Sequence, residues 1–284
     1  MSGLPRPEHL ATTEWLAEQL GRADVRILDA RWRPDGSAAQ VHAASRIPGS
    51  IHVDWREDLV DTDEGAEAIR LAAADRVAEV AAKAGLGDGM TLVIYDDTQG
   101  LYAARVWWSF RAYGLDSVRV LDGGFSAWVA ENRPLASGPE AAPLGSLPTT
   151  FTPRGPNQLR LTTADIRGLL GSPETTLLDA RAPAEYRGFE GNTRRLGHIP
   201  GAINVPIGGM HEPGGHRLRD SDALRGRLHA ANVSRGRRMV TYDGSGIAAA
   251  KLAYVLTLLG HDDVAVYDGG WAEWGNRLDL PVDR

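Results

Sequence analysis

Short apolar runs alternate along the chain with longer segments in which apolar residues recur at helical spacing. Runs rich in Val, Ile, Leu and Tyr predict buried strands at 25–28, 51–53, 91–95, 118–121, 239–242 and 264–267. Helical spacing predicts helices at 73–84, 101–113 and 247–259, and each is followed by a glycine, a residue type that readily ends a helix. Strands that alternate with helices predict an α/β fold in which a mostly parallel sheet is flanked by helices.

The second half of the chain repeats the first. The segment Leu-Asp-Ala-Arg around Asp29 recurs 150 positions later around Asp179, and the Asp-Gly-Gly that begins at Asp122 recurs 146 positions later at Asp268. Two further blocks, an Ile-Pro-Gly turn and a Tyr-Asp pair, recur in the same order at similar offsets. Ordered blocks at nearly constant spacing predict a duplicated domain.

A segment rich in Pro, Gly, Ala and Ser separates the two copies and has little periodicity. We therefore expect a first domain at 1–132, a linker at 133–157 and a second domain at 158–284.

Composition narrows the classes of function. The chain has 284 residues, long enough for two ordinary domains, and a formal net charge of −6. A net negative charge does not favour binding to nucleic acid, and it gives no reason to expect an anionic membrane as partner. The sequence has no apolar run of transmembrane length and no signal-peptide pattern at its start, so we expect a cytoplasmic protein.

The chain contains no cysteine. Disulfides, thiolate metal sites and cysteine nucleophiles are therefore excluded for this chain. We expect no cofactor and no metal. The pair His211 and His216 lacks the spacing of a helical zinc motif and is predicted to lie in an exposed loop.

The turn that begins at Asp243 joins a predicted strand to a predicted helix. In parallel sheets, ligands bind beyond the carboxyl ends of the strands, where this turn lies. The backbone amides of the turn and the start of the helix favour an anion there. The candidate binding residues of the turn are Gly244, Ser245, Gly246, Ile247 and Ala248.

The ordered motifs resemble those of the tandem-domain rhodanese family, in particular its 3-mercaptopyruvate sulfurtransferase-like branch. They are Asp29-Ala30-Arg31, Ile47-Pro48-Gly49, Leu121-Asp122-Gly123-Gly124, Asp179-Ala180-Arg181, Glu185-Tyr186-Arg187-Gly188, Gly197-His198-Ile199-Pro200-Gly201-Ala202 and Asp268-Gly269-Gly270-Trp271. The resemblance spans nearly the whole chain. It implies two tandem rhodanese-like domains, of which the first is non-catalytic, with the pocket of the second at the domain interface.

The resemblance also implies a reaction: transfer of sulfane sulfur from thiosulfate or mercaptopyruvate through a cysteine persulfide. In the family the turn begins with that cysteine, and here the position holds Asp243. The first domain holds an Asp at the matching place, Asp96 or Asp97. Arginines of the family's rim bind the anionic donor, and their candidates here are Arg187, Arg194 and Arg195.

No side chain of this chain can carry sulfane sulfur, so we expect sulfur transfer to be absent or altered. Asp243 could accept the amides of the turn and cap the following helix, which would lower its pKa. The protein would then be a pseudo-enzyme that binds a small anion or a partner protein, which could supply a thiol.

Three further hypotheses stay open. One is a hydrolase that uses Asp243 as nucleophile or base. A remoter one is dinucleotide binding, because the turn also fits G-x-G-x-x-A and Asp268 ends the next strand. The third is that Asp243 was introduced in place of a cysteine.

Several more polar and aromatic residues are expected to be structural. His198 is predicted to be a hydrogen-bonded turn histidine, and Arg181 to pair with a neighbouring acid. Three aspartates at strand ends, Asp29, Asp179 and Asp268, should brace turns through backbone amides. Trp107 and Trp108 are expected in the core, and Trp271 and Trp274 at the domain interface or the pocket rim.

Overall fold

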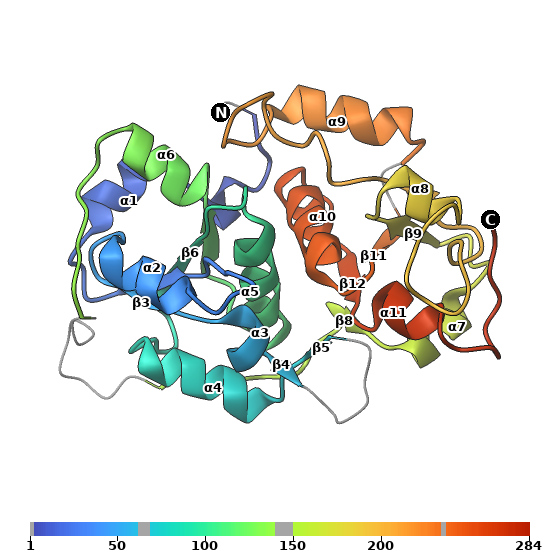
Figure 1. Cartoon of the computed structure of the whole chain (residues 1–284), viewed down its shortest axis with the longest axis horizontal. Coiled ribbons are helices and arrows are strands. Elements are labelled where there is room, and N and C mark those ends of the chain that lie inside the picture. The colour runs from blue at the N-terminus through green and yellow to red at the C-terminus, as the bar shows by residue number, and fades with distance from the viewer. Residues whose placement is uncertain (1–2, 62–68, 140–149, 234–236) are drawn as a thin grey trace.

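A computed structural model describes residues 3–61, 69–139, 150–233 and 237–284 of the chain. The chain forms two α/β units that lie side by side, with the first half on the left of Figure 1 and the second on the right. Among the described residues, no helix is long and apolar enough to cross a membrane.

Each unit is built on a five-stranded parallel sheet. The first contains β1 (Leu10–Ala11), β2 (Val25–Asp29), β3 (Ser50–His52), β6 (Thr91–Tyr95) and β7 (Val118–Leu121), in the order β1-β7-β6-β2-β3. The second contains β8 (Arg160–Leu161), β9 (Thr175–Asp179), β10 (Ile203–Asn204), β11 (Arg238–Tyr242) and β12 (Val264–Tyr267), in the order β10-β9-β11-β12-β8. Each strand of one sheet has a counterpart at the same place in the other, which confirms the predicted repeat.

The helices follow the strands in the same repeated order. Those of the first half are η1 (Pro7–His9), α1 (Thr13–Gln19), α2 (Ala38–Ala44), α3 (Trp55–Asp58), α4 (Ala74–Lys83), α5 (Leu101–Ala112) and α6 (Gly124–Ala130). Those of the second half are α7 (Thr163–Leu169), α8 (Pro183–Tyr186), α9 (Ser221–Ala230), α10 (Ile247–Leu258) and α11 (Gly270–Trp274). A short antiparallel pair, β4 (Val60–Asp61) with β5 (Arg70–Leu71), belongs to the first half. The predicted strands and long helices agree with these elements to within two residues.

Successive residues of the central strands belong to different cores, as expected for a sheet covered on both faces. In β2, Ile27 packs in a core with Leu16 of α1 and Trp128 of α6, whereas its neighbour Leu28 packs in a larger core with α5. Side chains of a strand alternate between the two faces of the sheet, so continuous apolar runs are what such buried strands require. The α/β fold predicted from these runs is therefore confirmed.

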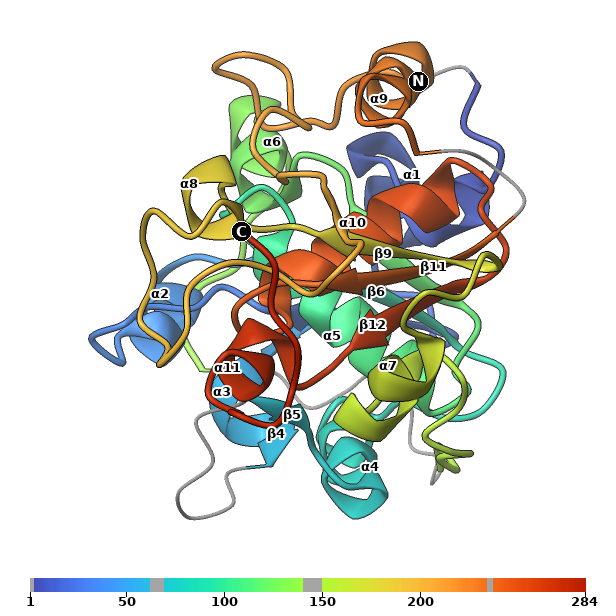
Figure 2. The same cartoon turned by 90° about the vertical axis from the view of Figure 1, so that its right-hand side faces the viewer.

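The two units meet along α5 and α10, which pack against each other (Figures 1 and 2). Both helices are buried along most of their length, and alanines at the start of each allow a close approach. Trp107 meets the ring of Tyr254 edge-on across the boundary, at 5.1 Å between centroids. Trp107 and Trp108 are both buried, as predicted. One hydrophobic core therefore continues from one unit into the other.

Two strand-end aspartates hold the units together reciprocally. Asp122 of the first unit accepts the backbone amide of Leu218 and an N–H of Arg217, both from the second. Asp268 of the second unit accepts the backbone amide of Leu71 from the first, at 2.7 Å. The prediction that Asp268 braces its own turn is therefore wrong in part, because its oxygens accept hydrogen bonds from the other unit.

Trp271 and Trp274, predicted at the domain interface or the pocket rim, belong to the core of the second unit. Their exposed fractions are 3% and 0%. Trp271 lies under the guanidinium of Arg181, and Trp274 meets Tyr267 edge-on and donates to the carbonyl of Pro281. An indole that is paired in this way is stable in a core, which its position in the sequence does not reveal.

Candidate active site

In the turn after β11, backbone amides face a position suited to an anion, which we call the anion cradle. The carboxylate of Asp243, which begins the turn, occupies this cradle. Asp243 is 6% exposed. One carboxylate oxygen accepts the amide of Gly246 and the other accepts the amide of Ala248, at 3.1 Å. Both oxygens thus point back at the loop and at the start of α10, where unpaired amides and the positive helix end favour an anion.

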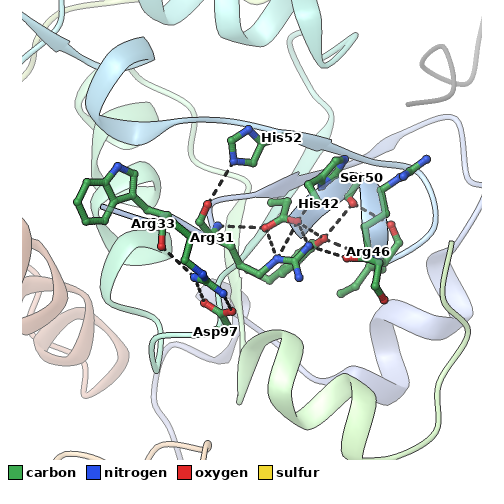
Figure 3. A network of polar contacts seen from close by, with 12 residues as sticks. Arg31, Arg33, His42, Arg46, Ser50, His52 and Asp97 are labelled. Carbon is green, nitrogen blue, oxygen red and sulfur yellow. Dashed lines mark hydrogen bonds and ion pairs between the residues drawn. The ribbon is translucent and has the colours of Figure 1, made fainter. Parts of the chain in front are cut away.

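The first domain repeats this arrangement with Asp96. Asp96 follows Tyr95 at the end of β6, as Asp243 follows Tyr242 at the end of β11. It is fully buried, and its two oxygens accept the amides of Thr98, Gly100, Tyr102 and Ala103 at 2.8–3.0 Å. Of the two residues left open by the sequence, Asp96 is therefore the counterpart of Asp243. Asp97 turns away and pairs with Arg33, as Figure 3 shows.

Burial raises the pKa of Asp243, and the hydrogen bonds from the loop amides, which lower it, only partly offset this effect. The prediction that its pKa falls is therefore wrong. The sequence showed the amides that favour the carboxylate but not the complete desolvation of the group. Burial raises the pKa of Asp96 in the same way.

Neighbouring elements hold the turn on two sides. The carbonyls of Asp243 and Gly244 accept the amides of Trp271 and Ala272 at the start of α11. Gly270 has a φ of +56°, and a Cβ at this position would lie 2.6 Å from the carbonyl oxygen of Asp243. Only glycine fits such a close approach of two backbones.

Arg105 of the first domain holds the turn from the other side, and sequence reasoning missed it. Its Nη1 donates to the carbonyl of Gly246 at 3.3 Å and its Nη2 to Oδ1 of Asp268 at 3.0 Å. Arg105 is fully buried, and a Cβ on Gly246 would lie 2.6 Å from its Nη1. The turn therefore lies at the domain interface, where the resemblance placed the pocket.

The three arginines predicted at the rim make their contacts away from the turn. Arg187 is exposed, with its guanidinium 5.4 Å from the ring of Phe189, and Arg194 is exposed as well. Arg195 donates to carbonyls of the C-terminal segment, those of Trp274, Arg277 and Leu280. In the described part of the chain, no hydrogen bond or ion pair joins these three side chains to Asp243. Their role in binding a donor stays a prediction.

Beside each turn lies a buried Asp–Arg pair. Arg181 pairs with Asp179 at 2.6 Å, as predicted, and Arg31 pairs with Asp29 at 2.5 Å. Asp29 and Asp179 also accept the backbone amides of Arg31 and Arg181, so both brace their turns as predicted.

In the first domain, further side chains join this hydrogen-bond network. His42, labelled in Figure 3, and Tyr95 both contact Asp29 at 2.8 Å. Burial of Asp29 tends to raise its pKa. The hydrogen bonds from His42 and Arg31 outweigh this effect, so the pKa of this carboxyl is lowered overall.

The three histidines considered in the sequence differ in their surroundings. His198 contacts the carbonyl of Tyr186 through Nδ1 at 2.8 Å and stacks on its ring, as a structural turn histidine does. His216 is exposed, as predicted, but His211 is 7% exposed and lies at the domain interface, so the prediction of an exposed loop is wrong for His211. Within the described ranges, no cluster of three or more His, Asp or Glu side chains could hold a metal ion.

Comparison with known proteins agrees with this geometry. The model of the rhodanese-like domain matches the chain twice, at residues 12–131 and 162–277. The SseB protein of Mycobacterium tuberculosis is 34% identical over 285 residues, with 98% of each chain covered. The 3-mercaptopyruvate sulfurtransferase of Escherichia coli K12 is 32% identical, with 95% of this chain and 96% of that protein covered. The human 3-mercaptopyruvate sulfurtransferase is 33% identical, with 94% and 92% covered.

Solved structures give the same result. The crystal structure of SseA from Escherichia coli, described as a 3-mercaptopyruvate sulfotransferase of rhodanese fold, superposes with a TM-score of 0.80 at 27% identity. The superposition covers 93% of this chain and 98% of SseA. Two matched domains, full-length relatives above 30% identity and a common architecture show that the chain belongs to the rhodanese family, although it contains no cysteine.

Proposed function

We propose that this protein is a rhodanese-family pseudo-enzyme that does not transfer sulfur and that acts by binding a partner protein. The observation that carries the proposal is the position of Asp243. Its two oxygens accept the amides of Gly246 and Ala248, the place that the family's reaction gives to a sulfur anion. A carboxylate group cannot accept and release sulfane sulfur as a thiolate does.

Because Asp243 occupies the anion cradle, a small anion is disfavoured as the ligand of this turn. Relatives are named for thiosulfate and mercaptopyruvate, both small anions, and a second anion would meet the buried charge of Asp243 at this turn. A small anionic sulfur compound is therefore a weaker candidate at the turn than a partner protein that contacts the rim. A partner that carries a thiol of its own would supply the group that this chain lacks. The cytoplasm is the proposed location, on the sequence features alone.

The same contacts weigh against a hydrolase and against dinucleotide binding. A nucleophilic or basic Asp243 would need a lone pair aimed at a substrate, whereas both oxygens face backbone amides. Dinucleotide binding would need Asp268 to accept a ribose hydroxyl, whereas Asp268 already accepts from Arg105, Arg160 and Leu71.

The test is sulfur transfer to cyanide from thiosulfate and from 3-mercaptopyruvate, measured for the protein and for Asp243→Cys. We expect no turnover by the protein and measurable turnover by the variant. Asp96→Cys is the matched control, because it places a thiol in the equivalent turn of the first domain, which we propose is non-catalytic. Turnover by the unmodified protein would overturn the proposal. Turnover by neither protein nor Asp243→Cys would show that the pocket has diverged beyond one residue, and would leave only the binding half of the proposal.

A further inference from the structure

Lys251 is a buried lysine at the domain interface. It is 4% exposed, lies in α10, and is one of only two lysines in the chain. Arg105 of α5 lies 146 positions earlier, and the same spacing separates Asp268 from Asp122. Lys251 therefore takes, beside the turn of the first domain, the place that Arg105 takes beside the turn of the second.

The two cations differ in how their charge is neutralised. Arg105 forms an ion pair with Asp268 at 3.0 Å. The equivalent carboxylate for Lys251 is Asp122, but Asp122 pairs with Arg217 and also accepts the amide of Leu218. In the described part of the chain, no carboxylate lies within ion-pair distance of the Lys251 ammonium.

The remaining neighbours of Lys251 do not supply a counter-charge by direct contact. Its Nζ lies 3.5 Å from Nδ1 of His211, a weak contact for one of its three N–H groups. Asp96 acts on Lys251 only through space, and both its oxygens accept backbone amides. Tyr254, one turn further along α10, donates its hydroxyl to the carbonyl of His9. A buried ammonium with so little direct compensation is unfavourable unless a counter-ion or water reaches it.

A small cavity of about 20 Å³ adjoins Lys251. Its walls include Gln99, Gly100 and Asp122 of the first domain and His211 of the second. The exposed side chains of Gln99 and His216 lie towards solvent, so the cavity can exchange its contents. This volume is enough to hold a single water-sized particle.

We propose that this cavity binds one monovalent anion of about the size of a water molecule, a halide, as the counter-ion of Lys251. The anion completes the charge balance of the domain interface in the same way that Asp268 does for Arg105. The site is separate from the turn at Asp243, so it stands or falls independently of the proposed function.

The charged and titratable neighbours give the site a pH dependence. Burial lowers the pKa of Lys251 to about 8, and Asp96 partly counters this. Burial and the nearby Lys251 lower the pKa of His211 to about 4, so this ring is neutral at pH 7. Asp122 is paired with Arg217, and His216 is exposed at the mouth. Halide binding should therefore weaken as the pH rises above about 8, where the ammonium loses its proton.

The test is thermal unfolding at pH 7 in chloride, bromide and gluconate salts of equal ionic strength. Chloride and bromide should raise the melting temperature to a plateau, by about 3 °C at roughly tenfold the dissociation constant, and gluconate should not. Lys251→Met should abolish the halide effect. Lys83→Met, at the only other lysine, is the matched control and should keep it.

An equal rise in gluconate, or a halide effect that persists in Lys251→Met, would overturn the proposal. If Lys251→Met fails to fold, Lys251→Arg serves instead, because the larger guanidinium should occupy the space of the anion and should likewise abolish the halide effect. A direct measurement uses the unmodified protein. Crystals grown in bromide should show an anomalous peak beside Nζ of Lys251, and its absence at saturating bromide would also overturn the proposal.

Discussion

The guanidinium of Arg105 and the carboxylate of Asp268 form an ion pair at 3.0 Å across the boundary between the two domains. Both side chains are buried, with exposed fractions of 0% and 3%. The same guanidinium also reaches the carbonyl of Gly246, in the turn that carries Asp243. One residue of the first domain thus supports both the interface and the turn of the second.

Replacing Arg105 by Leu should destabilise the protein by about 3 kcal/mol, because Asp268 then loses a buried cationic partner. Arg160 and the amide of Leu71 still contact Asp268 and limit the loss. Chemical denaturation followed by tryptophan fluorescence measures the change. Arg277→Leu is the control, since Arg277 pairs with Asp279 on the surface, and it should leave the midpoint unchanged. Equal midpoints for the two variants would contradict this account of the interface.

Replacement of Gly246 and of Gly244 by alanine should change the stability of the protein by different amounts. Gly246 has a φ of +84° and lies against Arg105, so Gly246→Ala should cost about 2 kcal/mol from backbone strain and displacement of the guanidinium. A Cβ on Gly244 would meet no heavy atom of another segment within 4 Å, and the φ of Gly244 is not in the left-handed region, so Gly244→Ala should be tolerated. Thermal unfolding of both variants tests the difference. A loss at Gly244 as large as that at Gly246 would show that the turn is held differently.

The raised pKa of Asp243 predicts a direction for the pH dependence of stability. An acid whose pKa is higher in the folded state binds its proton more tightly there, so its contribution to stability falls as the pH rises from its ordinary value of 3.8 to the folded value. The stability of the protein relative to Asp243→Asn should therefore decrease with rising pH over that window and then level off. Using the variant as reference cancels the contributions of Asp96 and Asp122. Urea denaturation between pH 4 and pH 8, at roughly half-unit steps, measures it, and a relative stability that increases with pH would contradict the burial of Asp243.

In buffer without halide, Lys251 should titrate near pH 8. Because only two lysines are present, selective labelling of lysine gives two side-chain signals, and Lys83→Arg assigns them. The lowered pKa means that the charged form is disfavoured by folding, so the stability relative to Lys251→Met should rise as the pH increases from about 8 to 10.5. The gain should total about 3 kcal/mol. A titration midpoint for Lys251 near 10.5 would show that the side chain is solvated or fully paired.

Local patterns were sufficient to predict the fold. The strand Thr91–Tyr95 and the start of the helix at Ile247 follow from apolar runs and glycine positions, which depend only on neighbouring residues. The repeat followed from ordered motifs such as the two Asp-Gly-Gly turns. These features are local, so they can be recognised without knowing which segments meet in space.

Contacts between distant segments could not be predicted in this way. The Arg105–Asp268 pair joins residues 163 positions apart, and nothing in the pattern of either helix or strand marks it. The repeat could have found it, because Arg105 and Lys251 occupy equivalent positions and both are cations within apolar helices. The pKa of Asp243 was predicted in the wrong direction for a similar reason. Amide partners are visible in the local sequence, whereas complete burial depends on α5 and α11, which come from elsewhere in the chain.

The most direct test of the central claim is the mass of the intact protein after incubation with thiosulfate or 3-mercaptopyruvate and removal of the donor. We predict that the unmodified protein gains no mass, because Asp243 holds the cradle and no thiol is present, and that Asp243→Cys gains the mass of one sulfur atom, which cyanide then removes. A cyanide-removable sulfur on the unmodified protein would contradict the claim that Asp243 has replaced the sulfur anion at this site.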